Sequence, residues 1–147
     1  MDKIILIIFL IYTFFGAIFE HLSYYIGKQL FQSKEKYLSN PILTGFPLYG
    51  LGGLLIYYLY DKYFRSYSPI TLFFVFGFIL SSLEYLVGKY IVNAGKSNKG
   101  VISWDYHDEP FNYEGIISLR HFIMWGIVSL VVIKIQPILQ KKLQNIL

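Results

Sequence analysis

Four long stretches of the chain carry almost no charge, and they constrain the fold more than any other feature. They run from Ile4 to Phe19, Tyr37 to Tyr60, Ser66 to Leu83 and Ile116 to Ile133, the last with one arginine. A helix that crosses a bilayer needs about 20 mostly apolar residues, because each residue rises by about 1.5 Å. We therefore predict four transmembrane helices, at about residues 4–26, 47–60, 69–88 and 116–136.

The composition agrees with a membrane protein of one domain. Hydrophobic residues make up 55% of the 147 residues and charged residues only 15%, with a mean hydropathy of +0.49. An ordinary soluble domain carries about a quarter charged residues. We predict an all-α polytopic helix bundle in which residues 1–147 form a single integral membrane domain.

Cysteine count and net charge exclude several classes of function. The chain has no cysteine, which excludes disulfides, thiolate nucleophiles and Cys-ligated zinc. The net charge of +4 comes from scattered loop lysines, without a basic nucleic-acid-binding motif. We interpret these lysines as contacts to anionic membrane lipid and expect no nucleic-acid partner.

The second uncharged stretch contains residues that break helices. Asn40-Pro41, Gly45, Pro47 and Gly50 precede its most apolar part. We expect a turn or a broken, partly re-entrant entry, with the helix beginning near Pro47. Such backbone survives at membrane depth only where protein or water surrounds it.

The connection between the third and fourth predicted spans, residues 89–115, is long. It holds a flexible polar run, residues 93–100, and then an aromatic and acidic piece, residues 104–112. A plain linker rarely has that second composition, so we expect a lid-like loop folded over the mouth of the bundle.

The distribution of charges gives a weak indication of orientation. With four spans both termini share one side, and each side carries six basic residues. The loop acids lie mainly on the other side, which leaves the side of the termini more basic. We expect a multi-pass protein of the cell membrane with cytoplasmic termini.

Ionisable side chains converge at one level of the predicted bundle. Because the chain crosses an even number of times, Glu20 and Glu84 at two helix ends meet Tyr49 and Arg120 at two helix beginnings. Both acids lie in stripes of small residues at helical spacing, where membrane helices approach closely. We therefore predict that both acids point into the bundle.

Several interpretations of this cluster remain open. Arg120 could lie between Glu20 and Glu84 and lock the helices together, or the cluster could bind an ionic ligand or pass protons. General acid–base catalysis would also suit buried carboxylates, although the spacing identifies no catalytic residue. His21 and His121 could add metal ligands, but no H-x-x-x-H or E-x-x-H spacing exists here, so we predict neither a metal nor a cofactor.

Separated landmarks resemble one known family. They are Glu20; Gly45 with Pro47-Leu48-Tyr49-Gly50; Ser82-Leu83-Glu84-Tyr85; and Trp104-Asp105-Tyr106, Pro110-Phe111-Asn112, Gly115, Leu119 and Trp125-Gly126. In this order they resemble the bacterial ABC-transporter permease family called CmpB-like, or ABC transporter type IV. The resemblance covers nearly the whole chain and implies a membrane component of a transporter. No Walker A loop occurs, so a separate ATP-binding subunit would be required, and a homo-oligomer or larger complex would surround the path.

Our prediction is a small membrane transport component with a polar site near one interface. The alternatives are a membrane-embedded enzyme or lipid-headgroup-binding protein that uses the same cluster, and an accessory subunit whose ion pairs only hold the bundle. The residues predicted to bind substrate are Glu20, Tyr49, Glu84, Trp104, Asp105, Tyr106, Asn112 and Arg120.

Overall fold

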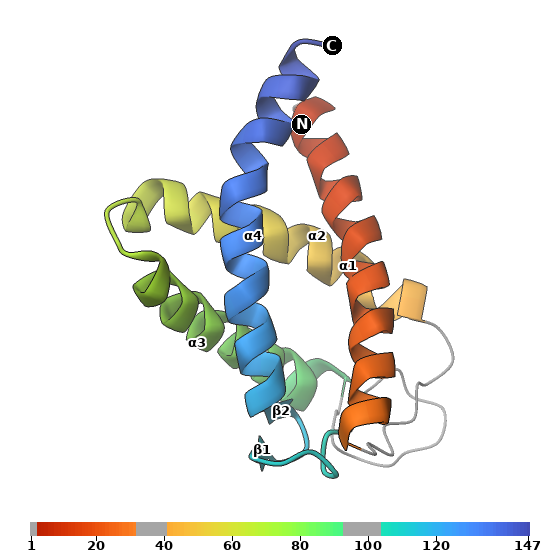
Figure 1. The fold of residues 1–147 in the computed structure, drawn as a ribbon. Coiled ribbons are helices and arrows are strands. Elements are labelled where there is room, and N and C mark those ends of the chain that lie inside the picture. Colours follow the sequence, from red (N-terminus) through yellow and green to blue (C-terminus); the bar gives the residue numbers. More distant parts are fainter. Residues whose placement is uncertain (1–2, 32–40, 93–103) are drawn as a thin grey trace.

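The computed structural model describes residues 3–31, 41–92 and 104–147, and these are mostly helical (Figure 1). The polar run predicted at residues 93–100 lies outside the described residues. Four helices carry the fold, and a two-stranded hairpin precedes the last of them. The elements are α1 (Lys3–Phe31), α2 (Pro41–Leu59), α3 (Pro69–Val87), β1 (Asn112–Tyr113), β2 (Ile117–Ser118) and α4 (Leu119–Gln144), with π-helical segments at Tyr60–Phe64 and Gly88–Val92.

Three of the described helical segments are long and apolar enough to cross a membrane. They cover Lys3–Leu22, Pro69–Ile91 and Leu119–Gln144. These segments confirm the helical membrane character predicted from the first, third and fourth uncharged stretches. A crossing by α2 stays a prediction.

The predicted start of the second helix was wrong. Helix α2 begins at Pro41 and continues through position 47 to Leu59, rather than starting near Pro47. Proline at the first position of a helix costs no hydrogen bond, because that N–H has no partner within the helix. Tyr49 and Gly50 lie inside this helix and do not open a broken one, and Gly50 lies against Thr13 and Phe9 of α1.

The last helix also differs from its predicted bounds of 116–136. It begins at Leu119, because Ser118 is its N-cap and the side chain of Ser118 accepts a hydrogen bond from the backbone N–H of His121. It continues past Pro137 to Gln144. At about 1.5 Å per residue, 26 residues extend farther than the roughly 30 Å hydrocarbon core of a bilayer.

The hairpin before α4 departs from the all-α prediction. Strands β1 and β2 pair antiparallel, with Asn112 opposite Ser118. Glu114 and Gly115 turn the chain with positive φ angles of 54° and 64°, as a tight hairpin turn requires. This short hairpin feeds the chain directly into α4.

The stripes of small residues lie where helices pack closely, as predicted. A Cβ atom added at Gly50 would overlap Thr13 and Phe9 of α1, and one added at Gly16 would overlap the ring of Tyr49. The α3–α4 contact has the same character, since a Cβ at Gly126 would lie 2.5 Å from the ring of Phe73. Small residues thus let these backbones approach each other.

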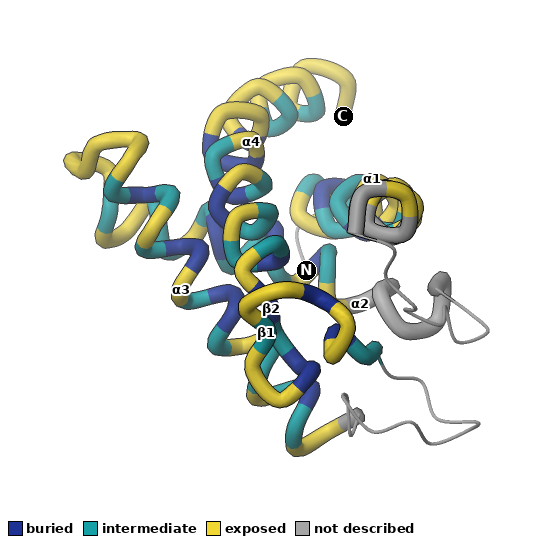
Figure 2. Tube along the Cα trace, turned by 60° about the horizontal axis from the view of Figure 1, so that its bottom comes forward, coloured by how far each residue is buried: buried dark blue, intermediate teal, exposed yellow. Residues whose placement is uncertain are grey.

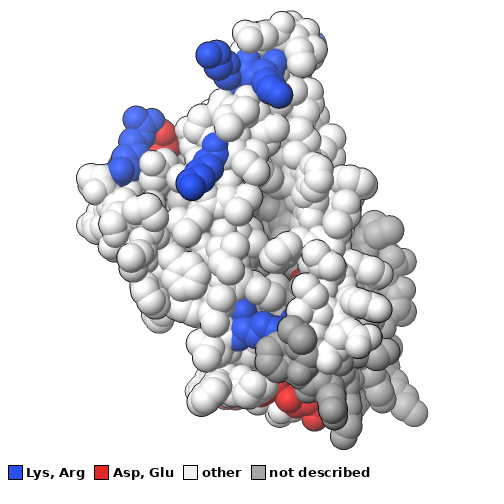
Figure 3. All heavy atoms as spheres, viewed as in Figure 1, with Lys and Arg blue, Asp and Glu red and all other residues white. Residues whose placement is uncertain are grey.

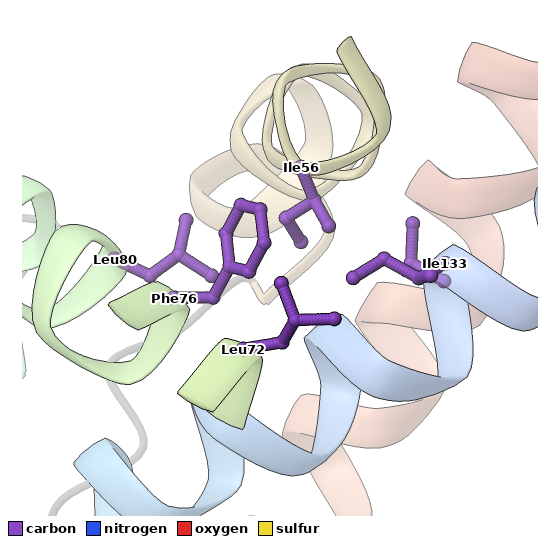
Figure 4. Close-up of a cluster of buried hydrophobic side chains, with 6 residues drawn as sticks. Ile56, Leu72, Phe76, Leu80 and Ile133 are labelled. Carbon is purple, nitrogen blue, oxygen red and sulfur yellow. The ribbon is translucent and has the colours of Figure 1, made fainter. Parts of the chain in front are cut away.

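A hydrophobic cluster joins α2, α3 and α4 (Figure 4). Phe76 of α3 is fully buried at its centre, and Ile56 of α2 is 1% exposed. Figure 4 shows Ile56, Phe76 and Ile133 pointing toward one another from three different helices. The other members are Leu72, Leu80 and Val132.

Exposed residues cover the outer faces of the helices (Figure 2). Many of them are large and apolar, for example Phe14, Ile70 and Phe78, each more than 60% exposed. A soluble protein rarely exposes so much apolar surface, whereas lipid tails cover it at no cost. The start of α1 and the end of α4 lie at the same end of the molecule (Figure 1), as expected for both termini.

Candidate functional site

Glu84 lies where α3, α4 and the loop before α4 meet. Its carboxylate accepts a hydrogen bond from the indole N–H of Trp125 at 2.8 Å and another from the hydroxyl of Tyr106 at 3.1 Å. Trp125 belongs to α4 and Tyr106 to the loop. An acid inside a membrane-capable helix is thus oriented by donors from two other parts of the fold.

Glu20 is connected to the same place through α2. The hydroxyl of Tyr49 donates to the carboxylate of Glu20 on α1. The Tyr49 ring lies 5.9 Å from the ring of Trp125, centroid to centroid. Glu20, Tyr49, Trp125 and Glu84 therefore form a row across all four helices, which we call the acid–aromatic row. The predicted convergence of the two acids and Tyr49 agrees with this arrangement.

The loop end of the site is a buried acid that the sequence analysis did not select. Glu109 is 2% exposed and accepts hydrogen bonds from Arg120 and, at 2.5 Å, from the hydroxyl of Ser118. Burial by itself would raise the pKa of this carboxyl, but hydrogen bonds from His121, Arg120 and Ser118 lower the pKa to about 2. Glu109 is therefore an ionised anchor between the loop and the start of α4.

The ion pair of Arg120 bears on one of the open interpretations. That interpretation had Arg120 between Glu20 and Glu84, whereas the structure gives it an ion pair with Glu109. Side-chain exposure in this pair is 13% for Arg120 and 1% for Glu109. The reason is geometric: Arg120 is the second residue of α4 and lies next to the loop that contains Glu109.

His121 joins the two parts of the site. Its ring stacks on that of Tyr106, with the centroids 3.8 Å apart and the planes 16° from parallel. Ser118 lies 2.9 Å from Nδ1 of His121, and Glu109 lies 3.6 Å from the same nitrogen. In a Ser-His-acid triad the serine and the acid bind opposite ring nitrogens, so this trio is a helix cap rather than a nucleophile with its base.

Three predicted site residues hold the loop in shape. The indole N–H of Trp104 donates to the backbone oxygen of Ile116 at 2.7 Å, and Asp105 accepts from the backbone N–H of His107 at 3.1 Å. The amide of Asn112 donates to the backbone oxygen of Glu109 at 2.8 Å. Each of these bonds lies within residues 104–118. These side chains therefore stabilise the loop conformation that places Tyr106 and Glu109.

Sequence reasoning thus selected part of the site and missed other parts. The contacts bring together Glu20, Tyr49, Glu84 and Tyr106, and the missed residues are Glu109, Ser118, His121 and Trp125. Helical spacing is a signal that could have indicated Trp125, because Trp125 and Ser129 lie one turn apart on α4. Glu109 carried no such signal, because a loop has no periodicity that distinguishes a buried acid from a solvated one.

Potential metal ligands are not grouped in the described part of the chain. No group of three or more His, Asp or Glu side chains there could hold a metal ion. The acids of the site are bound by tyrosine, tryptophan, serine and arginine, which are hydrogen-bond donors.

Comparison with known proteins gives a family but no individual relative. Neither a curated protein nor a solved structure matches the chain. A family model matches residues 7–147, nearly the full length. The chain is a membrane protein with apolar helices, and it belongs to the family described as Putative ABC-transporter type IV.

Proposed function

We propose that this protein is the membrane-spanning component of a transporter in the cell membrane, and that the acid–aromatic row with its loop is the polar site where a cation or proton binds. One observation carries the proposal: Glu84 lies in a membrane-capable helix and is oriented by side chains from α4 and the loop. Ionisable residues inside membrane segments are costly, so their presence favours a role in binding or transfer.

Each part of the site has a role in this proposal. Glu84 and Glu20 supply the negative charge, and Tyr106, which reaches Glu84 from the loop, covers the site as part of a lid. Arg120 neutralises Glu109 and ties the lid to α4. Trp104, Asp105 and Asn112 keep the lid in its folded shape.

A transporter of this kind needs other subunits. No Walker A sequence occurs in the chain, so ATP would be hydrolysed by a separate ATP-binding subunit. Four helices are also too few to surround a path for a solute, which favours a homo-oligomer or a larger complex within the lipid.

We propose that the termini face the cytoplasm. Basic side chains are more numerous toward the end of the molecule that carries the C-terminus, where an acid lies beside some of them, and acids and further basic side chains lie toward the opposite end (Figure 3). Basic residues near membrane segments are retained on the cytoplasmic side. In the proposed four-span topology the basic residues on the side of the termini are Lys3, Lys62, Arg65, Lys134, Lys141 and Lys142.

Gentle extraction of the tagged protein from its own membrane, followed by native mass spectrometry, tests this proposal. We expect an ATP-binding subunit to copurify in fixed ratio. A lone protein or homo-oligomer that holds one defined lipid would instead favour the enzyme or lipid-binding alternative.

The variant Glu84→Gln tests the site within that complex. Glutamine keeps the size and one acceptor oxygen, so we expect a nearly unchanged melting midpoint in detergent. ATP hydrolysis should fall to the rate of the ATP-binding subunit alone. Glu114→Gln, which changes an exposed loop acid, is the matched control. A lower melting midpoint with normal hydrolysis per folded complex would instead assign Glu84 a purely structural role.

A further inference from the structure

We propose that the protein moves as two helix pairs, which pivot near the end that carries the termini and separate at the level of the acid–aromatic row. The first pair is α1 with α2, and the second pair is α3 with α4 and the loop at residues 104–118. This inference rests on the proposed function and names the movement that opens its site. It follows from which contacts lie within each pair and which lie between the pairs.

Each helix pair is packed closely at several points along its length. In the first pair, Gly16, Gly50 and Gly53 lie so near the facing helix that an added Cβ would overlap a side chain there. In the second pair, Gly77 and Gly126 face phenylalanine rings, at 3.1 and 2.5 Å from an added Cβ. Helices in such close contact move together, because sliding or tilting one against the other creates overlaps.

The hydrogen bonds described for the two membrane acids also stay within the pairs. Glu20 accepts from Tyr49, and both belong to the first pair. Glu84 accepts from Trp125 and Tyr106, and all three belong to the second pair. At this level the pairs meet through the rings of Tyr49 and Trp125, 5.9 Å apart between centroids. Separation of the pairs here therefore breaks none of these hydrogen bonds, and each acid keeps its donors.

Stronger contacts between the pairs lie away from the row. The hydroxyl of Tyr12 on α1 donates to the amide oxygen of Gln136 on α4, and Gln136 is 2% exposed. Ile56 of the first pair packs with Phe76 and Ile133 of the second in the hydrophobic cluster (Figure 4). A buried hydrogen bond is costly to break, because water cannot replace the lost partner. We therefore place the pivot at the contact of Tyr12 with Gln136.

The shape of the molecule agrees with a pivot at that place. Helices α1 and α4 lie close together near the termini and diverge toward the end that carries the hairpin (Figure 1). The surface is hollowed between these two helices, with an acidic side chain visible in the hollow (Figure 3). Glu20 lies eight residues beyond Tyr12 on α1, and Trp125 lies eleven residues before Gln136 on α4. At about 1.5 Å per residue the row is about 12–16 Å from the pivot, so a rotation displaces the row much more than the pivot.

Distances between nitroxide labels, measured by pulsed electron paramagnetic resonance on the full-length protein in lipid nanodiscs, test the inference. The chain has no cysteine, so the labels attach only to introduced ones. The row pair is Leu22→Cys with Ile123→Cys, and the pivot pair is Leu10→Cys with Ile135→Cys, all at positions at least 40% exposed. We expect the distance distribution of the row pair to be at least about twice as broad as that of the pivot pair, because displacement grows with distance from a pivot. Leu22→Cys with Leu48→Cys lies within the first helix pair and is the matched control, which should give a narrow distribution.

Two variants test the pivot itself. Gln136→Leu removes the hydrogen bond at similar side-chain volume, and Tyr12→Phe removes it from the other helix; each should broaden the distribution of the pivot pair. Equal widths for the row pair and the pivot pair, whether narrow or broad, would overturn the pivot, and a broad control pair would overturn the rigid first helix pair. An unchanged pivot pair in both variants would overturn the role of the Tyr12–Gln136 bond. Copurification of an ATP-binding subunit, which tests the proposed function, does not depend on any of these distances.

Discussion

Replacing the buried loop acid, Glu109→Gln, should destabilise the protein in a pH-dependent way. The pKa of Glu109 is about 2 in the folded protein and 4.5 as an ordinary glutamate. At about 1.36 kcal/mol per pKa unit, the ionised carboxylate contributes at most about 3.4 kcal/mol at neutral pH. Breaking a buried ion pair such as Glu109–Arg120 typically costs about 3–5 kcal/mol, which agrees with this size.

The sign of the pH dependence follows from the lowered pKa. A carboxylate that is more acidic in the folded state stabilises the protein above its unfolded pKa, and the contribution is lost as the pH falls toward the folded pKa. The contribution of Glu109 should therefore be complete above about pH 5.5 and fall to about 1.4 kcal/mol at pH 3. Below pH 2 the variant and the unchanged protein should unfold alike.

Denaturant unfolding in detergent from pH 7 to pH 2.5, followed by tryptophan fluorescence, measures this difference. Glu114→Gln is the control, because Glu114 is an exposed acid of the same loop whose pair with Lys89 is also exposed; its stability should stay close to that of the unchanged protein. A deficit of Glu109→Gln that does not change with pH would refute the reasoning, because the deficit would then arise from packing rather than from the ionised pair.

Two further predictions concern helix packing, and circular dichroism during thermal unfolding in detergent measures both. Gly50→Ala should lower the free energy of unfolding by about 1–3 kcal/mol, because the added Cβ overlaps Thr13. Gly52→Ala, whose Cβ has open space, should be neutral or slightly stabilising through helix propensity. Equal effects of the two variants would contradict the close approach of α1 and α2. Phe76→Ala should lower the free energy of unfolding by about 3–5 kcal/mol, because Phe76 is fully buried. Phe78→Ala should lower it far less, because Phe78 is 69% exposed. A similar loss in both variants would place the core elsewhere.

The class of fold followed from local properties of the sequence. Uncharged stretches of membrane length predicted apolar helices, and the described helices α1, α3 and α4 have that character. Small residues at helical spacing predicted close contacts, which Gly16 and Gly50 make. The start of α2 was misjudged because glycine and proline do not always break a helix: proline is tolerated at the first position of a helix, and glycine inside a helix allows a neighbouring helix to approach closely.

The partners of the polar residues required the tertiary structure. Glu84 and Trp125 are 41 residues apart, and Glu20 and Tyr49 are 29 apart. Which of these side chains meet depends on how far each helix rotates about its axis, and no local pattern contains that rotation.

By itself the sequence determined a helical membrane protein with its acids gathered at one level, because hydrophobicity and the 3.6-residue period act within each segment. Only the tertiary structure decided that Arg120 pairs with Glu109 and that Trp125 holds Glu84. The physical reason is that a hydrogen bond between distant residues depends on the relative placement of whole elements. The fold of residues 104–118 places Glu109 beside Arg120, and the packing of α3 against α4 places Glu84 beside Trp125.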